Sequence, residues 1–544
     1  SEKNRFQRAS ESAFEALTRA YDRSLSRVLR HPGLTLLSFA ATLAATGLLF
    51  VVIPKGLIPI QDTGVILGQT QAAPDVSPAE MARLQQRLAS EVASDPDVAQ
   101  VVSVAGGSRS GNQGLIFAAL KPREEGRSSA MVIVNRLRPQ LSRVEGASLI
   151  MQPAQDITFG GRQARGLFQY TLEGSNFDQL RTWSSRLFTK LQGVPEIVDL
   201  STDQEANGPT VTLTINRDTA ARFGIEPAAI DAVIADAFSQ QQVTQFFTQF
   251  NTYKVILEVL PEMQGSLDTF SKLYVRSPTT GEAVPLTTLA TLDTTPIAPL
   301  VFSHQGGFPA VTFSFNLAPG ASLGQVVSAI DTARGEVGLP ASIGGSFQGN
   351  AQAFQSSLAT VPFLIAAALF AIYVILGVLY ESYVHPITIL STLPSAGLGA
   401  LLTMYVFRID FTLIGLIGLI LLIGIVKKNG IMMVDFAIQS EREGQLSPLE
   451  AIHKACLMRL RPILMTTACT ILGGLPLMLQ QGTGSELRRP LGFAIVGGLA
   501  LSQILTLFST PVIYLEIDRL RRGWKTWPFA DRAALAEPDR ARRS

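Results

Sequence analysis

Residues 411–437 read FTLIGLIGLILLIGIVKKNGIMMVDFA, a stretch that is apolar except for Lys427, Lys428 and Asp435. A helix of this length can cross the roughly 30 Å of hydrocarbon in a bilayer. An ionisable group inside such a segment costs at least about 2.5–3.5 kcal/mol, so it is a functional candidate. Lys428 lies about 6 Å beyond the middle of the segment. We interpret it as a cation that faces a helix bundle and pairs with a carboxylate; the alternative is that both lysines mark a membrane boundary.

The carboxylate that Lys428 needs is missing from the other apolar segments. Asp435 lies about two turns further along the same helix, which is beyond contact. Arg459 and Thr466, in MRLRPILMTT (458–467), share one helix face. The threonine hydroxyl can pass or accept a proton, or can bond to its own backbone. The missing partner predicts that this chain is one half of a longer machine.

Five further apolar segments complete the predicted membrane part. The six predicted spans cover residues 33–53, 357–380, 386–407, 411–438, 460–480 and 489–516. Only 16% of the residues are charged and the mean hydropathy is +0.26, whereas a soluble domain has roughly 25% charged residues. The chain is therefore a polytopic α-helical membrane protein with a large extramembrane domain between its first and second spans.

The distribution of Lys and Arg predicts the orientation. Residues 1–32, 439–461 and 517–544 are rich in basic side chains, and six spans place all three on one side of the membrane. The positive-inside rule makes that side cytoplasmic, so the large domain faces outwards. Residues 1–32 are predicted to form an amphipathic helix, lying either on the membrane surface or on the protein itself. A second cytoplasmic helix is predicted over 447–457.

The extramembrane domain contains a repeated β-α-β-β-α-β pattern, typical of ferredoxin-like α+β units. The first unit covers 54–160. The second is divided into 161–207 and 300–355 by an insertion at 208–299. Two such units side by side leave a cleft, which is a plausible ligand site.

Several functional classes are disfavoured. Cys456 and Cys469 are the only cysteines, so the extramembrane domain has no disulfide framework or cysteine nucleophile. The histidines, which a metal-efflux protein would cluster with Met or Cys, are scattered: His31, His304, His385 and His453. No nucleophile–base pair points to an enzyme, and a net charge of +2 does not indicate a nucleic-acid partner.

Four motifs carry a family resemblance. They are LYESYVHPITILSTLPSAGLGALL (379–402), GIVKKNGIMMVDFA (424–437), CLMRLRPILMTT (456–467) and GSELRRPLG (484–492). The chain resembles the C-terminal half of the resistance–nodulation–division (RND) efflux transporters, spans seven to twelve. PKGLIPIQDTG (54–64) resembles most closely the Mdt/Mux-type subunits of heteromeric pumps.

This resemblance implies a proton-driven multidrug antiporter, without a cofactor, that gives antibiotic resistance in the inner membrane of Gram-negative bacteria. Lys428 is then the lysine that pairs with an aspartate pair in the N-terminal half, and Arg459 and Thr466 belong to the same proton relay. The two ferredoxin-like units become periplasmic porter subdomains and the insertion becomes a docking domain. The implied partners are a homo- or heterotrimer, a periplasmic membrane-fusion adaptor, an outer-membrane channel, membrane lipid and small amphiphilic substrates.

The loop at residues 105–113, AGGSRSGNQ, departs from the family pattern. Well-known drug pumps carry phenylalanines there, whereas this loop has Arg109 and three candidate hinge glycines, Gly106, Gly107 and Gly111. Aromatic lining is expected instead from Phe117 and, across the cleft, Phe168 and Tyr170. We interpret the loop as part of a substrate path with altered specificity; a plain hairpin is the alternative.

A rival interpretation is a partner subunit that shapes the substrate path of a heterotrimer without moving protons. The intact set of Lys428, Arg459 and Thr466 argues against it. The deciding fact is whether the N-terminal half carries both aspartates.

Overall fold

The structure is a computed structural model of the chain. It describes residues 5–106, 111–161, 164–204, 208–209, 211–239, 241–294, 297–298, 302–444 and 446–523. They form two compact units: Ala72–Pro78 with Gln204–Phe302, and the remainder of the chain.

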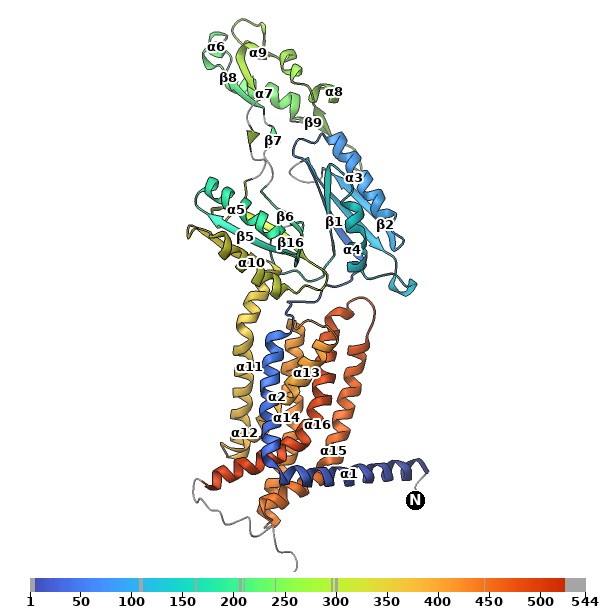
Figure 1. Cartoon of the computed structure of the whole chain (residues 1–544). Helices are drawn as coiled ribbons and strands as arrows, with labels where there is room; N and C mark the ends of the chain where they lie inside the picture. Colours follow the sequence, from blue (N-terminus) through green and yellow to red (C-terminus); the bar gives the residue numbers. More distant parts are fainter. Residues whose placement is uncertain are drawn as a thin grey trace, which may run out of the picture. The chain divides into compact units, whose positions relative to one another are not determined.

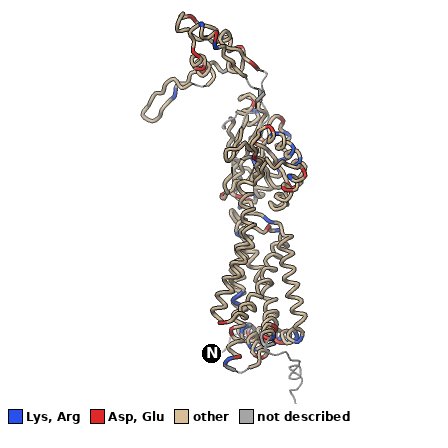
Figure 2. Tube along the Cα trace, turned by 90° about the vertical axis from the view of Figure 1, so that its left-hand side faces the viewer, with Lys and Arg blue, Asp and Glu red and all other residues tan. Residues whose placement is uncertain are grey.

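Among the described residues, six helical segments are long and apolar enough to cross a membrane. They are α2 (Pro32–Val52), α11 (Asn350–Tyr380), the pair α12 (His385–Leu390) and α13 (Leu393–Val406), α14 (Leu413–Gly444), α15 (Pro448–Leu479) and α16 (Ser485–Gly523). They form a bundle in which α16 packs against α13, α14 and α15 (Figure 1). Charged residues are sparse along most of the bundle (Figure 2).

Two helices differ from the sequence prediction. The expected cytoplasmic helix at 447–457 and the following span are one continuous helix, α15, because Pro462 removes only one backbone donor and does not end it. The predicted span 386–407 is instead interrupted at Ser391 and Thr392, just before Pro394. Both hydroxyls donate to carbonyls of the preceding turn, Thr388 O at 2.6 Å and Ile389 O at 2.8 Å.

Helix α1 (Arg5–Arg30) packs on the protein through its second half. Tyr21 and Leu25 are buried in the core formed with α15 and α16. The Tyr21 hydroxyl donates to Leu507 O at 2.8 Å, and His453 lies 2.9 Å from the Asp22 carboxylate. Of the two alternatives for this helix, packing on the protein applies to this half.

The first sheet has the predicted β-α-β-β-α-β element order. Its elements are β1 (Val65–Ala72), α3 (Pro78–Ala93), β2 (Val98–Ala105), β3 (Gln113–Leu120), the one-turn η1 (Arg123–Glu125), α4 (Ala130–Leu141) and β4 (Ala147–Pro153). The strand order is β2-β3-β1-β4. Burial alternates strictly along β1, as expected for a strand with one face against a helical layer. Leu88 of α3 and Ile133 of α4 are fully buried in the core of this sheet.

The second sheet repeats this order around the insertion. Its elements are β5 (Phe168–Gly174), α5 (Phe177–Gln192), β6 (Ile197–Thr202), β15 (His304–Gln305), β16 (Phe308–Leu317), α10 (Leu323–Val337) and β17 (Ile343–Gln348). β16 pairs with β5 and β6, and β17 pairs with the other edge of β5. The start of α11 contributes Ala351 and Phe354 to the same core, so β5 is buried along nearly its whole length.

The second unit contains the insertion. Its elements are β7 (Gly208–Pro209), β8 (Thr212–Ile215), α6 (Arg217–Arg222), α7 (Pro227–Phe238), β9 (Gln241–Phe247), β10 (Thr252–Leu257), α8 (Pro261–Gln264), η2 (Leu267–Lys272), β11 (Tyr274–Arg276), β12 (Ala283–Pro285), α9 (Leu286–Leu289), β13 (Ala290–Asp293) and β14 (Ile297–Ala298). A small core around Ile230 and Leu289 holds it together. β9 and β10 form an antiparallel hairpin whose side chains are all exposed.

Candidate functional site

The three predicted relay residues lie on two neighbouring helices. Lys428 of α14 is exposed, and no hydrogen bond or ion pair joins it to another described residue. Arg459 of α15 places its guanidinium carbon 4.9 Å from the ring centroid of Phe436 on α14. Its buried Nε has no acceptor among the described residues. The Thr466 hydroxyl donates to Ile463 O of its own helix at 3.1 Å. The structure thus brings Arg459 against α14 but does not connect Lys428 to Arg459 or Thr466.

A buried polar cluster lies next to these residues in the chain, and sequence reasoning missed it. Asn429 of α14 donates from Nδ2 to Thr467 Oγ1 and to Gln503 Oε1, both at 3.2 Å. The Thr467 hydroxyl of α15 donates to Gln503 Oε1 of α16 at 2.6 Å. We call these three side chains the polar triad. The sequence does show a polar residue directly after each of Lys428 and Thr466. It does not show that these two residues contact Gln503 on α16.

The candidate hinge loop is described in part. Gly106 has a φ of +69°, which favours glycine, and its N–H donates to Gln113 O at 2.8 Å. Gly111 is exposed. Gly107 and Arg109 lie outside the described residues. The described ends of the loop join β2 and β3 as a hairpin, and Phe117 on β3 is 41% exposed.

Phe168 and Tyr170 are core residues, which corrects the expectation that both line a substrate path. They lie on the same face of β5 as Leu172, in the core that includes Leu187 of α5. Phe168 stacks on Phe315 with ring centroids 6.0 Å apart. Tyr170 is 1% exposed and packs 4.8 Å from the ring of Phe347. Alternate residues of a strand lie on one face, so Phe168 and Tyr170 point into the same core as Leu172. Phe168 alone also reaches a cavity.

That cavity has a volume of about 450 Å³. It lies where segments of the two sheets meet the adjacent ends of the membrane helices. Aromatic lining comes from Phe159, Phe168 and Phe407; charged lining comes from Arg408, Asp410, Glu486 and Arg489. Burial raises the pKa of the Asp410 carboxyl. A mostly apolar cavity of this size with a few polar groups is suited to an amphiphilic molecule.

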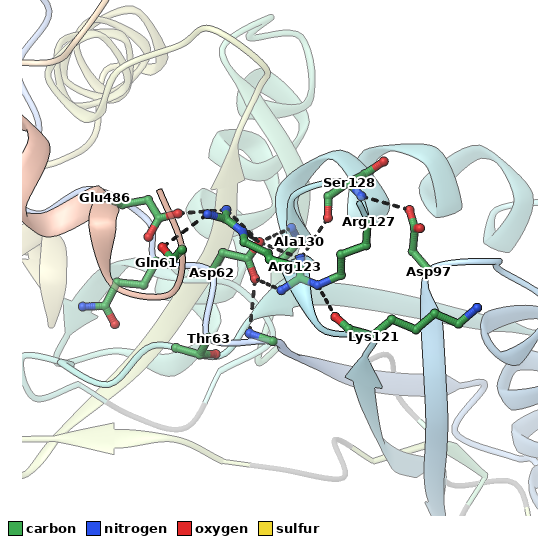
Figure 3. A network of polar contacts seen from close by, with 12 residues as sticks. Gln61, Asp62, Thr63, Asp97, Lys121, Arg123, Arg127, Ser128, Ala130 and Glu486 are labelled. Atoms are coloured by element: carbon green, nitrogen blue, oxygen red, sulfur yellow. Dashed lines mark hydrogen bonds and ion pairs between the residues drawn. The ribbon is translucent and has the colours of Figure 1, made fainter. Parts of the chain in front are cut away.

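An ion-pair network lies at the edge of this cavity (Figure 3). Asp62 accepts two hydrogen bonds from Arg127, each 2.8 Å long, and one from the Ala130 N–H at 2.9 Å. Burial by itself raises the pKa of Asp62, but Arg127 and the N–H groups of Ala130 and Gly64 outweigh it and lower the pKa to about 2. Asp62 is therefore ionised, and it anchors the start of α4.

Arg123 connects this network to a membrane helix. Its Nη2 lies 3.0 Å from Asp62 Oδ2 and 2.9 Å from Glu486 Oε1, at the start of α16. Its Nη1 donates to Gly482 O at 3.3 Å, in the loop before that helix. The two acidic partners are far apart in sequence, so no local pattern predicts this contact.

A second ion pair joins the first sheet and its helices to the second sheet. Arg138 of α4 donates to both carboxylate oxygens of Asp199 on β6, at 2.8 and 2.7 Å. Asn316 of β16 donates to the same carboxylate at 3.0 Å. Asp199 has a φ of +54°, unusual for a residue other than glycine. The contact between the two sheets therefore includes a bidentate ion pair held at a strained residue.

Among the described residues, no three His, Cys, Asp or Glu side chains group closely enough to hold a metal ion.

Comparison with known proteins gives one family. Residues 1–518 match the model of the AcrB/AcrD/AcrF family. The chain is 46% identical over 513 residues to the multidrug resistance protein MdtC of Escherichia coli O7:K1 (strain IAI39 / ExPEC), covering 94% of this chain and 50% of that protein. MdtC of Escherichia coli (strain K12 / DH10B) gives the same identity and coverage. The chain thus spans about half the length of the curated relatives it matches.

Proposed function

The chain belongs to the AcrB/AcrD/AcrF family, and from this premise we propose that it forms the C-terminal half of a proton-driven multidrug efflux subunit. The protein is then a secondary transporter and not an enzyme. It exports amphiphilic compounds from the periplasm or the inner membrane in exchange for protons. The observation that carries the proposal is Lys428, an exposed cation on a membrane helix without a partner among the described residues.

The proton step uses the face of α14 and α15 that carries Lys428, Arg459 and Thr466. A carboxylate pair on the N-terminal half neutralises Lys428 when deprotonated and releases it when protonated. An unpaired ammonium group in hydrocarbon is costly, so each proton that binds or leaves changes how the two halves pack. The position of Arg459 against α14 supports this role, because it places a second fixed cation on the neighbouring helix.

The two sheets are proposed to be ferredoxin-like porter subdomains, and the insertion a docking domain. Their matching strand orders support the first assignment. The basic segments at both ends of the chain support a cytoplasmic location for them and a periplasmic one for the sheets. The subunit would act in the Gram-negative inner membrane, in a homo- or heterotrimer with a periplasmic adaptor and an outer-membrane channel.

The cavity beneath the two sheets is the proposed substrate passage. Its apolar walls suit the hydrophobic part of an amphiphile, and Arg408 and Arg489 can attract an anionic head group. Phe117, exposed on β3, is proposed to act further along the path, together with Arg109 of the loop sequence 105–113.

The test is transport by the full-length protein in proteoliposomes with an imposed pH gradient. A fluorescent amphiphile is the probe, and Lys428→Met is compared with wild type and with Lys427→Met. We expect Lys428→Met to abolish gradient-driven transport while insertion and assembly persist, and Lys427→Met to retain it. Normal gradient-driven transport by Lys428→Met would show that Lys428 is not needed for proton coupling and would overturn the proposal.

A further inference from the structure

The polar triad is buried between three membrane helices. Asn429 and Thr467 are each 5% exposed and Gln503 is 9% exposed. The triad contains no ionisable group. It joins α14, α15 and α16 at one level, through side chains that are 36 and 74 residues from Gln503 in sequence.

Two members of the triad directly follow relay residues. Asn429 follows Lys428 on α14, and Thr467 follows Thr466 on α15. Consecutive helical residues point about 100° apart, and the structure has Asn429 and Thr467 buried whereas Lys428 is exposed and Thr466 is half-buried. Fixing the buried residue of each pair therefore fixes the direction in which its neighbour projects.

The network is incomplete in a way that argues against a purely stabilising role. The buried Nε2 of Gln503 has no acceptor among the described residues. A partly satisfied buried polar network stabilises less than apolar side chains of the same size, and replacing it is often neutral or stabilising. The best-attested use of such groups is to select one register of packed helices.

We propose that Asn429, Thr467 and Gln503 are positioning residues, which hold the rotation of α14 and α15 so that Lys428 and Thr466 project towards the proton-binding carboxylates. This inference rests on the proposed function. Losing the triad lets α14 turn, which changes the distance between Lys428 and its carboxylate partners. The pH dependence of transport then shifts, because the protonation of those carboxylates depends on that cation.

Other ionisable groups surround α14 and need to be considered in reading a pH profile. Among side chains that the structure describes on α14 and the helices packed against it, they are Lys427, Asp435, Glu441 and Arg442 of α14, Glu450, His453, Lys454, Cys456, Arg459, Arg461 and Cys469 of α15, Glu486, Arg488, Arg489, Tyr514, Glu516, Asp518 and Arg519 of α16, Tyr405 of α13, His385 of α12, and Tyr373 and Tyr380 of α11. None of them forms a hydrogen bond or ion pair with Lys428 in the part of the chain that the structure describes. The triad variants alter none of these groups. A shift in the pH dependence of transport therefore indicates that Lys428 or Thr466 has been repositioned.

The experiment measures gradient-driven transport of a fluorescent amphiphile by the full-length protein in proteoliposomes, over a series of pH values, together with thermal stability. The variants Asn429→Leu, Thr467→Val and Gln503→Leu preserve side-chain volume approximately. We expect each to shift the pH of half-maximal transport by on the order of half a unit, with thermal stability unchanged or raised. Thr467→Ser keeps the hydroxyl and is expected to retain the wild-type profile.

Thr506→Val is the matched control. Thr506 is buried in α16, but its hydroxyl donates only to Ser502 O of its own helix, at 2.7 Å, so its variant should keep the profile. Lower stability with unshifted profiles in all three triad variants would overturn the inference. If Asn429→Leu fails to fold, the pair Thr467→Val and Thr467→Ser decides. Normal transport by Lys428→Met would remove the proposed function and this inference together; an inactive Lys428→Met with unshifted triad variants removes only the inference.

Discussion

Asp62 and Lys428 differ in whether the described chain supplies a partner for their charge. Asp62 is buried, but Arg127, Arg123 and two backbone N–H groups surround it, so the chain satisfies this charge by itself. Lys428 lies on a membrane helix and has no such partner among the described residues. The charge of Asp62 is thus neutralised by residues of this chain, whereas the proposed function requires a carboxylate for Lys428 from outside the described residues.

The largest expected effect on stability comes from breaking the ion pair between Asp62 and Arg127. Asp62→Asn leaves the guanidinium group of Arg127 buried without its carboxylate, and removing one partner of a buried pair costs about 3–5 kcal/mol. We expect the free energy of unfolding of the extramembrane part to fall by this amount, measured by denaturant titration with a tryptophan fluorescence probe. Glu80→Gln, which breaks an exposed pair with Arg83, is the control and should have little effect.

The same pair predicts a pH dependence. The pKa of Asp62 is lowered to about 2 in the folded protein, compared with about 3.9 when unfolded. Its stabilisation is therefore fully present above about pH 4–5 and is lost as the pH falls towards 2. Asp62→Asn should remove this part of the acid sensitivity; an identical acid transition in both proteins would contradict the assignment.

Removing the charge of Lys428 should be favourable, in contrast to the destabilisation expected for Asp62→Asn. Lys428→Met takes an ammonium group out of a membrane helix, which favours insertion by up to about 2.5–3.5 kcal/mol. We expect this chain, expressed by itself, to insert at least as well with the substitution, as measured by the membrane-integrated fraction. A marked fall in insertion would show that Lys428 already has a stabilising partner within the chain.

A smaller effect is expected where the network reaches the membrane helix. Arg123 and Glu486 are about a quarter exposed, so their coupling should be on the order of 1 kcal/mol. A double-mutant cycle with Arg123→Gln and Glu486→Gln measures it as thermal stability of the full-length protein. The coupling should weaken in high salt; strict additivity of the two variants would mean that the contact does not link the sheets to α16.

The smallest effect concerns the hairpin loop. Arg109→Glu replaces a cation suited to carboxylates on the proposed substrate path. We expect a few-fold loss of export, equivalent to roughly 0.5–1 kcal/mol, for anionic detergents or carboxylated drugs and less for cationic dyes. Minimum inhibitory concentrations for both classes, in one efflux-deficient strain at matched expression, make the comparison. A uniform loss, or a selective loss for cationic dyes, would exclude a role in charge preference.

The sequence by itself predicted the six membrane segments and the repeated β-α-β-β-α-β order, and it singled out Lys428 as a charge within a membrane segment. These features depend on apolar length, on local periodicity and on the cost of a charge in hydrocarbon, all of which are properties of consecutive residues. The continuous α15 and the interruption before Pro394 were not predicted, because a proline's effect on a helix depends on what packs around it.

Only the tertiary structure decided which distant residues meet. Phe168 and Tyr170 face the hydrophobic core because the helices packed on their sheet, and not their aromatic character, determine which face of β5 meets that core. Glu486 reaches Arg123 across 363 positions of sequence, and Gln503 reaches Asn429 across 74. Hydrogen bonds and ion pairs act over about 3 Å, so a pattern along the chain can name a polar residue but not the partner that folding brings to it.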